Sequence, residues 1–302
     1  MTDVSGVIAS AITPRGNEGD LDFGATFELV DYLCAAGLRG IALFGPTGEY
    51  PALSLDERSR LIYLAVKRSR VPVLVGIGSA TLDVSSALAL EARRAGVAGL
   101  LLPPPYFFRY QQDDIREFYL QFAAHVGTGA AIFLCNIPSF ASEIAVETAL
   151  GLLQTGLFAG IENAGGDLEY FARLQPAAET RSLTLLVAND AIFTRARSAG
   201  CSGAISPAAC AVPELMLALD RAVLSGDQPA AARLDELLQE FLAWIDQFPQ
   251  PAAIKTAVGL RGVKTGPLPV PLSPEKRRKL DEFREWFQGW LPAMKELSVT
   301  SV

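Results

Sequence analysis

Eight short apolar segments that alternate with longer amphipathic segments predict a closed (β/α)8 barrel with a C-terminal helical extension. The short segments are apolar at successive positions, as parallel strands are when helices cover both faces of their sheet. A weak internal repeat suggests equivalent βα units, because one glycine ends a helix and a second opens the next strand. The repeat occurs as Gly37 with Gly40, Gly96 with Gly99, and Gly200 with Gly203.

The predicted strands, in chain order, are residues 7–12, 40–44, 73–77, 99–102, 131–134, 158–161, 183–187 and 203–205. Helical stretches between them include residues 54–68, 82–95, 115–126 and 191–199. Ser54 and Glu57 have the spacing of a capping box at a helix start. An open doubly wound sheet is the alternative fold. It usually has a glycine-rich phosphate loop after its first strand, where this chain has Thr13-Pro14-Arg15.

The pattern beyond Pro213 is purely helical, with predicted helices at residues 234–248, 252–260 and 274–290. We expect residues 1–225 to form the barrel and residues 226–302 to form a helical extension packed on it. The length of 302 residues suits one barrel domain.

Composition excludes several classes of function. The net charge is −7 and the run Lys276–Lys279 has the pattern of a solvated helix face, so we expect no nucleic-acid partner. The four cysteines lack Cys-x-x-Cys spacing and His125 is the single histidine, which argues against zinc. No signal-peptide pattern and no membrane-length apolar run occur. We expect a cytoplasmic protein with reduced thiols, no metal, no cofactor and no membrane partner.

In a (β/α)8 barrel the active site forms at the C-terminal ends of the strands. The most specific segment there is Gly45-Pro46-Thr47-Gly48-Glu49, whose N–H groups and hydroxyl can hold a carboxylate. A plain β-turn before the helix at residue 54 explains this segment equally well. Asn189 and Asp190 suit ligand contact and an N-cap for the following helix equally.

Together these segments resemble the N-acetylneuraminate lyase and dihydrodipicolinate synthase (DapA-like) family of class I lyases. The matching motifs are Ala11-Ile12-Thr13-Pro14, residues 45–54, Asn136-Ile137-Pro138-Ser139, residues 160–167 and Ala204-Ile205-Ser206, and the likeness runs from about residue 7 to 290. The resemblance implies a small oxo acid or sugar acid as ligand and a homo-oligomer, a tetramer or dimer. It implies ligand contacts from Thr47, Gly48, Ser139, Asn189 and Ile205.

The resemblance also implies a sixth-strand lysine that forms a Schiff base with a 2-oxo acid, and here the matching position is Glu162. A carboxylate cannot form an imine. Cys135 stands where the family has a proton-relaying tyrosine, so we take Glu162 and Cys135 as the candidate catalytic pair. Three further positions depart: Pro46 replaces a hydroxyl residue, Phe140 replaces an arginine, and Phe107 replaces a tyrosine supplied by a neighbouring subunit, unless Tyr106 fills that position.

Three functions remain open. The first is a lyase with altered chemistry, in which Glu162 acts as a general acid or base. The second is a non-catalytic small-molecule-binding or vestigial protein, and the third is a conventional aldolase with a relocated lysine, Lys255 or Lys264. An ionised Glu162 would repel an anionic acid, so either Glu162 is protonated, or Arg15 or Arg109 pairs with it, or the ligand differs.

Overall fold

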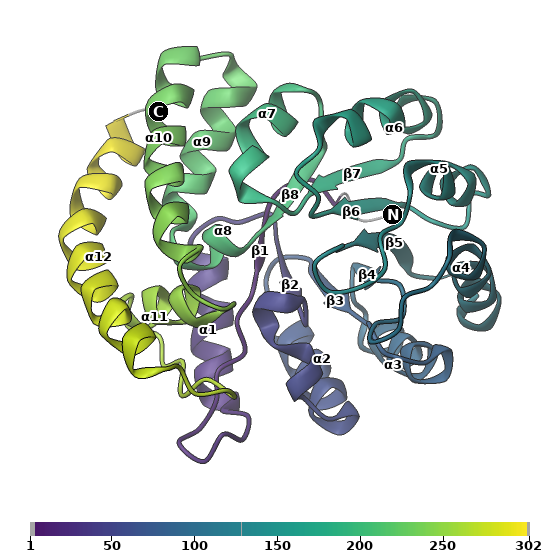
Figure 1. Cartoon of the computed structure of the whole chain (residues 1–302), viewed down its shortest axis with the longest axis horizontal. Helices are drawn as coiled ribbons and strands as arrows, with labels where there is room; N and C mark the ends of the chain where they lie inside the picture. The colour runs from purple at the N-terminus through teal and green to yellow at the C-terminus, as the bar shows by residue number, and fades with distance from the viewer. Residues whose placement is uncertain (1–3, 128, 301–302) are drawn as a thin grey trace.

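The computed structural model describes residues 4–127 and 129–300, and it shows the predicted closed barrel of eight parallel strands in sequential order (Figure 1). The strands are β1 (Gly6–Ser10), β2 (Gly40–Leu43), β3 (Val73–Gly76), β4 (Gly99–Leu102), β5 (Ala131–Asn136), β6 (Gly160–Asn163), β7 (Thr184–Val187) and β8 (Gly203–Ser206). Neighbouring strands pair in parallel around the whole ring, and β1 closes it by pairing with β8. The open doubly wound sheet is therefore excluded.

The fifth and sixth strands differ from their predicted bounds in a way that matters for the site. The predicted segments 131–134 and 158–161 end before Cys135 and Glu162, whereas β5 runs to Asn136 and β6 spans Gly160–Asn163. Cys135 pairs with Glu162 in the ladder. Strand limits follow backbone pairing rather than hydropathy, so these polar residues belong to the strands and not to the loops after them.

Helices surround the barrel as predicted. Those between the strands are α1 (Phe23–Ala35), α2 (Leu55–Arg68), α3 (Leu82–Ala95), α4 (Gln112–Val126), α5 (Val146–Gln154), α6 (Leu168–Arg181) and α7 (Phe193–Ser198). The capping box at α2 is confirmed, since Glu57 N donates to Ser54 Oγ and Ser54 N donates to the Glu57 carboxylate. The predicted helix 191–199 is divided into a 3-10 turn, Asp190–Ile192, and α7.

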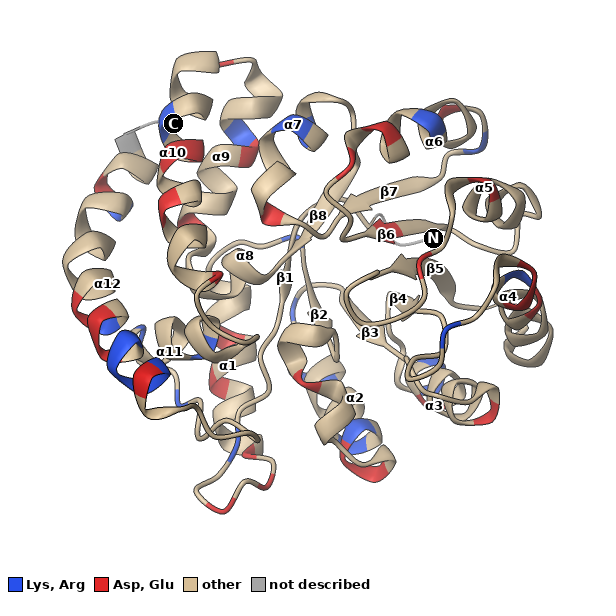
Figure 2. Ribbon diagram, in the orientation of Figure 1, with Lys and Arg blue, Asp and Glu red and all other residues tan. Residues whose placement is uncertain are grey.

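The C-terminal part is helical: α8 (Pro207–Ala211), α9 (Pro213–Ser225), α10 (Gln228–Ile245), α11 (Ala252–Leu260) and α12 (Pro274–Thr300). The helix predicted at 274–290 continues to Thr300. Figure 1 shows α10 and α12 along one flank, and Figure 2 shows acidic and basic residues interspersed on α12. Trp286 and Trp290 stack on each other and both donate to the Glu240 carboxylate, so aromatic packing fixes α12 on α10.

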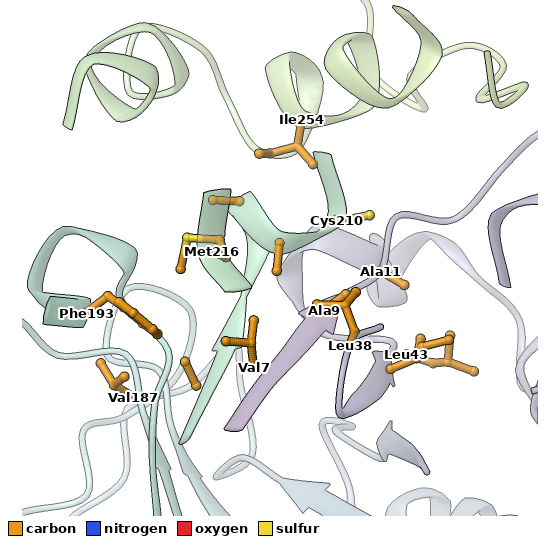
Figure 3. Close-up of a cluster of buried hydrophobic side chains, with 14 of the residues drawn as sticks. Val7, Ala9, Ala11, Leu38, Leu43, Val187, Phe193, Cys210, Met216 and Ile254 are labelled. Atoms are coloured by element: carbon orange, nitrogen blue, oxygen red, sulfur yellow. The ribbon is translucent and has the colours of Figure 1, made fainter. Parts of the chain in front are cut away.

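The core has two layers. Inside the barrel, Ile8, Leu74, Leu101, Phe133 and Ile205 pack together below the mouth. The outer layer lies between strands and helices, and Figure 3 shows side chains of β1, β7, α7 and α9 meeting there. This packing supports the strand ends that form the mouth. No helix within residues 4–127 and 129–300 is long and apolar enough to cross a membrane.

Candidate functional site

Glu162 and Cys135 form a buried pair at the mouth of the barrel. Glu162 is the third residue of β6 and Cys135 is the fifth residue of β5, and the two are paired in the ladder. The Cys135 thiol donates a hydrogen bond of 2.8 Å to Glu162 Oε2. The two predicted catalytic residues are therefore in direct contact, with exposed fractions of only 5% and 6%.

Burial dominates the ionisation of this pair. It raises the pKa of the Glu162 carboxyl to about 7, while the hydrogen bond from Cys135 acts in the opposite direction. Burial, followed by the nearby Glu162 carboxylate, raises the pKa of the Cys135 thiol well above its usual value. Cys135 is therefore a neutral thiol at physiological pH, and Glu162 exchanges its proton near neutrality.

A cavity of about 20 Å³ adjoins the pair, which is room for about one water molecule. Its described lining includes no lysine or arginine. Glu162 is thus the carboxyl group of a small, mostly apolar pocket. The lining residues are Phe44, Gly45, Pro46, Tyr50, Gly76, Gly78, Leu101, Pro103, Cys135, Ile137 and Glu162.

Neither arginine considered as a partner for Glu162 pairs with it. Arg15 donates to Gly19 O, and its Nε lies 3.9 Å from the Glu49 carboxylate. Arg109 donates to the backbone oxygen of Ala141. Pairing of Glu162 with Arg15 or Arg109 is therefore wrong, because loop carbonyls and another carboxylate hold these guanidinium groups elsewhere. The described residues thus form no salt bridge with Glu162, whose hydrogen-bond partner is the neutral Cys135 thiol.

The loop after β2 is tightly hydrogen-bonded within itself. It forms a 3-10 turn, Pro46–Gly48, in which Gly48 N donates to Gly45 O and Glu49 N donates to Pro46 O. Thr13 Oγ1 also donates to Gly48 O at 2.6 Å. Two of the amides expected to hold a carboxylate are thus already used. Ligand binding by Thr47, which is buried, and by Gly48 stays a prediction.

Lys255 lies behind this loop rather than in the mouth cavity. Its Nζ donates to Glu49 Oε2 at 2.8 Å and to Pro267 O at 3.2 Å. All six lysines are among the described residues, and none lines the cavity beside Glu162. An ammonium group within reach of a ligand at Glu162 would therefore require rearrangement of the chain.

The remaining predicted binding residues lie around the mouth without lining its cavity. Asn189 caps the turn after β7 by accepting from Ala191 N. Asp190 accepts from Ala208 N at the start of α8, and burial raises its pKa to about 6. Ile205 belongs to the barrel interior, and Ser139 is exposed after β5. Both members of the Asn189-Asp190 segment thus serve as caps, and their contact with a ligand stays a prediction.

Two mouth residues were not singled out from the sequence. The Tyr50 ring lines the cavity and packs edge-on against Tyr106, with centroids 5.6 Å apart. Arg58 is buried under it and donates to Gly76 O and Gly78 O, at the end of β3. Tyr50 follows the glycine-rich loop directly, which is a usable signal. No sequence signal pointed to Arg58, because an arginine on an amphipathic helix normally faces solvent.

An aromatic loop protrudes before α4. The exposed fractions of Phe107 and Phe108 are 86% and 64%, and their rings meet edge-to-face at 5.0 Å. Phe107 also has a positive φ of 86°, which is strained for a bulky side chain. Phe140 is 49% exposed in the loop after β5.

A (β/α)8 barrel with an ionisable pair at the C-terminal ends of adjacent strands has the architecture of barrel enzymes that act on small molecules. Within that class, the chain belongs to the dihydrodipicolinate synthetase family, whose sequence profile matches residues 3–288. The family assignment made from the motifs is confirmed.

Three comparisons illustrate the likeness. The chain is 31% identical over 273 residues to 4-hydroxy-tetrahydrodipicolinate synthase of Bacillus subtilis, covering 89% of this chain and 93% of the relative. The structure of 4-hydroxy-tetrahydrodipicolinate synthase from Methylacidiphilum fumariolicum SolV is similar, with TM-score 0.88, 29% identity, and coverage of 97% and 99%. A catalytic lysine mutant of Ruminococcus gnavus sialic acid aldolase shares the fold at 21% identity, with TM-score 0.88 and coverage of 96% and 97%.

Proposed function

We propose that this chain binds a small 2-oxo acid or sugar acid at the barrel mouth and acts on it by proton transfer through Glu162. The observation that carries the proposal is a buried carboxyl with a pKa of about 7 beside a cavity. A group whose pKa lies near the working pH both releases and takes up a proton readily. The chemistry is then that of a lyase-family enzyme without an imine, because a carboxylate cannot form one.

The charge of the ligand sets the order of the steps. At ~4 Å an ionised Glu162 would repel the carboxylate of an acid by roughly 4 kcal/mol at an effective dielectric constant of ~20. The acid therefore binds the protonated form, and Glu162 enters the reaction as an acid. For a hydroxy acid, Glu162 gives its proton to the departing hydroxyl group and then removes a proton from the adjacent carbon. The net reaction is loss of water, and the proton returns to Glu162.

Turnover by wild type and by Glu162→Gln tests the proposal. Both proteins are incubated with a panel of sugar acids and 2-oxo acids, and products are followed by NMR. Glutamine keeps the shape of the side chain and cannot donate an acidic proton, so we expect turnover to disappear. Cys135→Ser keeps a hydrogen-bond donor beside the carboxyl, so comparing it with Glu162→Gln separates the contribution of the carboxyl from that of its partner in the candidate pair. Equal turnover by wild type and Glu162→Gln would refute the proposal.

Binding provides a second test. Above pH 7, affinity for pyruvate should fall roughly tenfold per pH unit in wild type, because binding requires the protonated carboxyl. Glu162→Gln should bind pyruvate equally at pH 6 and pH 8, as measured by isothermal titration calorimetry. A pH-independent affinity in wild type would contradict this role for Glu162.

A non-catalytic binding or vestigial protein is the second candidate, favoured by Glu162 and Cys135 standing where the family resemblance implies a lysine and a tyrosine. Any turnover that disappears on mutation of the pocket would exclude it. The third candidate, an aldolase with a relocated lysine, is tested by borohydride trapping with pyruvate followed by mass spectrometry. We expect no lysine adduct, and an adduct would establish an imine.

We also propose that the chain is a cytoplasmic homo-oligomer, a tetramer or dimer, in which the loop with Phe107 and Phe108 contacts a second copy. Large exposed aromatic side chains favour burial at an interface. Size-exclusion chromatography with light scattering should give a dimer or tetramer, and Phe107→Ser with Phe108→Ser should weaken it. A clean wild-type monomer would contradict this assembly.

A further inference from the structure

A second cavity lies away from the mouth, between α11, α12 and the loop that joins them. Its volume is about 320 Å³, at the lower end of the range of roughly 300–1,000 Å³ typical of small-molecule sites. None of its lining residues also lines the cavity beside Glu162. It is therefore a separate space, and the chemistry of the mouth does not account for it.

The charges around this cavity favour an anion. Both ionisable residues in its described lining are cations, Lys255 and Arg284. Glu49 holds Lys255 and also lies 3.9 Å from Arg15, while Asp281 pairs with Arg284. Counting Arg15, which bonds to the wall at Thr265 but is not part of the lining, three cations share two carboxylates. The Arg284 side chain is 47% exposed, so its guanidinium is open to a further partner.

The rest of the lining is mainly apolar. It includes Ala252, Leu260, Pro267, Leu268 and Leu280. Two threonines, Thr256 and Thr265, are also in the lining, and the Thr256 hydroxyl is already bonded to Ala252 O. A mainly apolar chamber with cations in its lining is complementary to a molecule with one anionic end and an apolar body.

The wall of the cavity is firmly held. Thr265 O accepts from Arg15 N, and Pro267 O accepts from Lys255 Nζ. Gly266, with φ of +67°, lies so close to the Arg15 carbonyl that a Cβ would sit 1.8 Å from its oxygen. Only glycine fits there, and the loop cannot move toward the barrel. The site is thus preformed, which lowers the cost of ordering on binding.

We propose that this cavity is a second ligand site and that it takes a small monocarboxylate with an apolar body. The carboxylate lies against the Arg284 guanidinium, and the apolar body packs on Leu268 and Leu280. Through Lys255 the site contacts Glu49, the residue before Tyr50 of the mouth. The site does not depend on the function proposed for Glu162.

Phenylacetate is the probe, and phenylacetamide, of similar shape and without charge, is the ligand control. Gly259→Leu is designed to fill the cavity: a Cβ at Gly259 would lie in ordinary contact with Thr265, another lining residue, at 3.5 Å from its Oγ1, so the new side chain starts without a clash. Arg284→Gln removes the exposed cation. Thermal unfolding of both variants verifies that they fold, and isothermal titration calorimetry measures binding at pH 7.

We expect phenylacetate to bind wild type and Glu162→Gln alike, and binding to be lost in Gly259→Leu. Affinity should fall up to about fivefold in Arg284→Gln, the effect of one partly exposed ion pair. The amide resonance of Glu49 should shift as wild type is saturated. Binding that survives in Gly259→Leu, equal binding of phenylacetamide, or no binding at millimolar phenylacetate would each overturn the proposal. Loss of binding in Glu162→Gln alone would place the probe in the mouth and also overturn it.

Discussion

Replacing Glu162 with glutamine should remove a pH dependence that the buried carboxyl gives to the stability of the barrel. The pKa of Glu162 rises from 4.5, its ordinary value, to about 7 in the folded protein. The folded state therefore holds the proton more tightly than the unfolded chain does. The contribution of this proton to the free energy of unfolding is fully present below pH 4.5 and is lost as pH rises to about 7. At about 1.4 kcal/mol per pH unit, the loss over this window is about 3 kcal/mol.

Urea unfolding at pH values from 5 to 8 measures this effect as the difference in free energy of unfolding between wild type and Glu162→Gln. Groups that titrate in the same way in both proteins contribute equally to the two free energies of unfolding, so their contributions cancel in the difference. We expect wild type to lose on the order of 3 kcal/mol relative to the variant between pH 5 and pH 8, mostly below pH 7. A difference in free energy of unfolding that does not change with pH would refute the argument that burial raises the pKa of Glu162. A difference of opposite slope would mean that a cation stabilises the ionised carboxyl.

Three further changes test neighbouring parts of the site. Cys135→Ala removes the hydrogen bond that lowers the Glu162 pKa, so that pKa should rise further, as followed by carboxyl 13C NMR titration. Lys255→Met leaves the Glu49 carboxylate buried without its 2.8 Å partner, and urea unfolding at pH 7 should show a loss of about 3–5 kcal/mol. Asp190→Asn removes a carboxyl whose pKa is raised from 3.8 to about 6. Between these two pH values the free energy of unfolding of wild type should fall by about 3 kcal/mol through this group, and the variant should not show that fall.

Local sequence signals predicted the fold because they act over short distances along the chain. The glycines at 37, 96 and 200 all have positive φ and end helices, as their spacing indicated. The capping box of Ser54 and Glu57 forms between residues three apart. The hydropathy pattern located all eight strands, but it misplaced the ends of β5 and β6, because polar residues that face the mouth keep their ladder hydrogen bonds.

Long-range charge pairing could not be predicted in the same way. Lys255 and Glu49 are separated by 206 positions along the chain, and no local pattern links them. Arg58 is on an amphipathic helix, yet its guanidinium is buried on two carbonyl oxygens of the β3 end. Pairing of Arg15 with Glu162, one of the alternatives that the sequence left open, is not observed for the same reason, since the position of Arg15 is set by Gly19 O and Glu49. Partners of buried charges are chosen by tertiary packing.

The family resemblance implies an amine at position 162, and the carboxyl that this chain has there would give the mouth different electrostatics as well as a different nucleophile. An amine there would switch the pocket between neutral and positive, and its charged form would attract an anionic acid. Glu162 switches it between neutral and negative, with the change near pH 7. The thiol of Cys135 suits this arrangement, because it donates a hydrogen bond to the carboxylate and adds no charge of its own. An arginine at the same place would hold Glu162 ionised and remove its proton from use. A neutral donor beside a buried carboxyl, with no cation in the described lining, is therefore the combination that the proposed proton transfer requires.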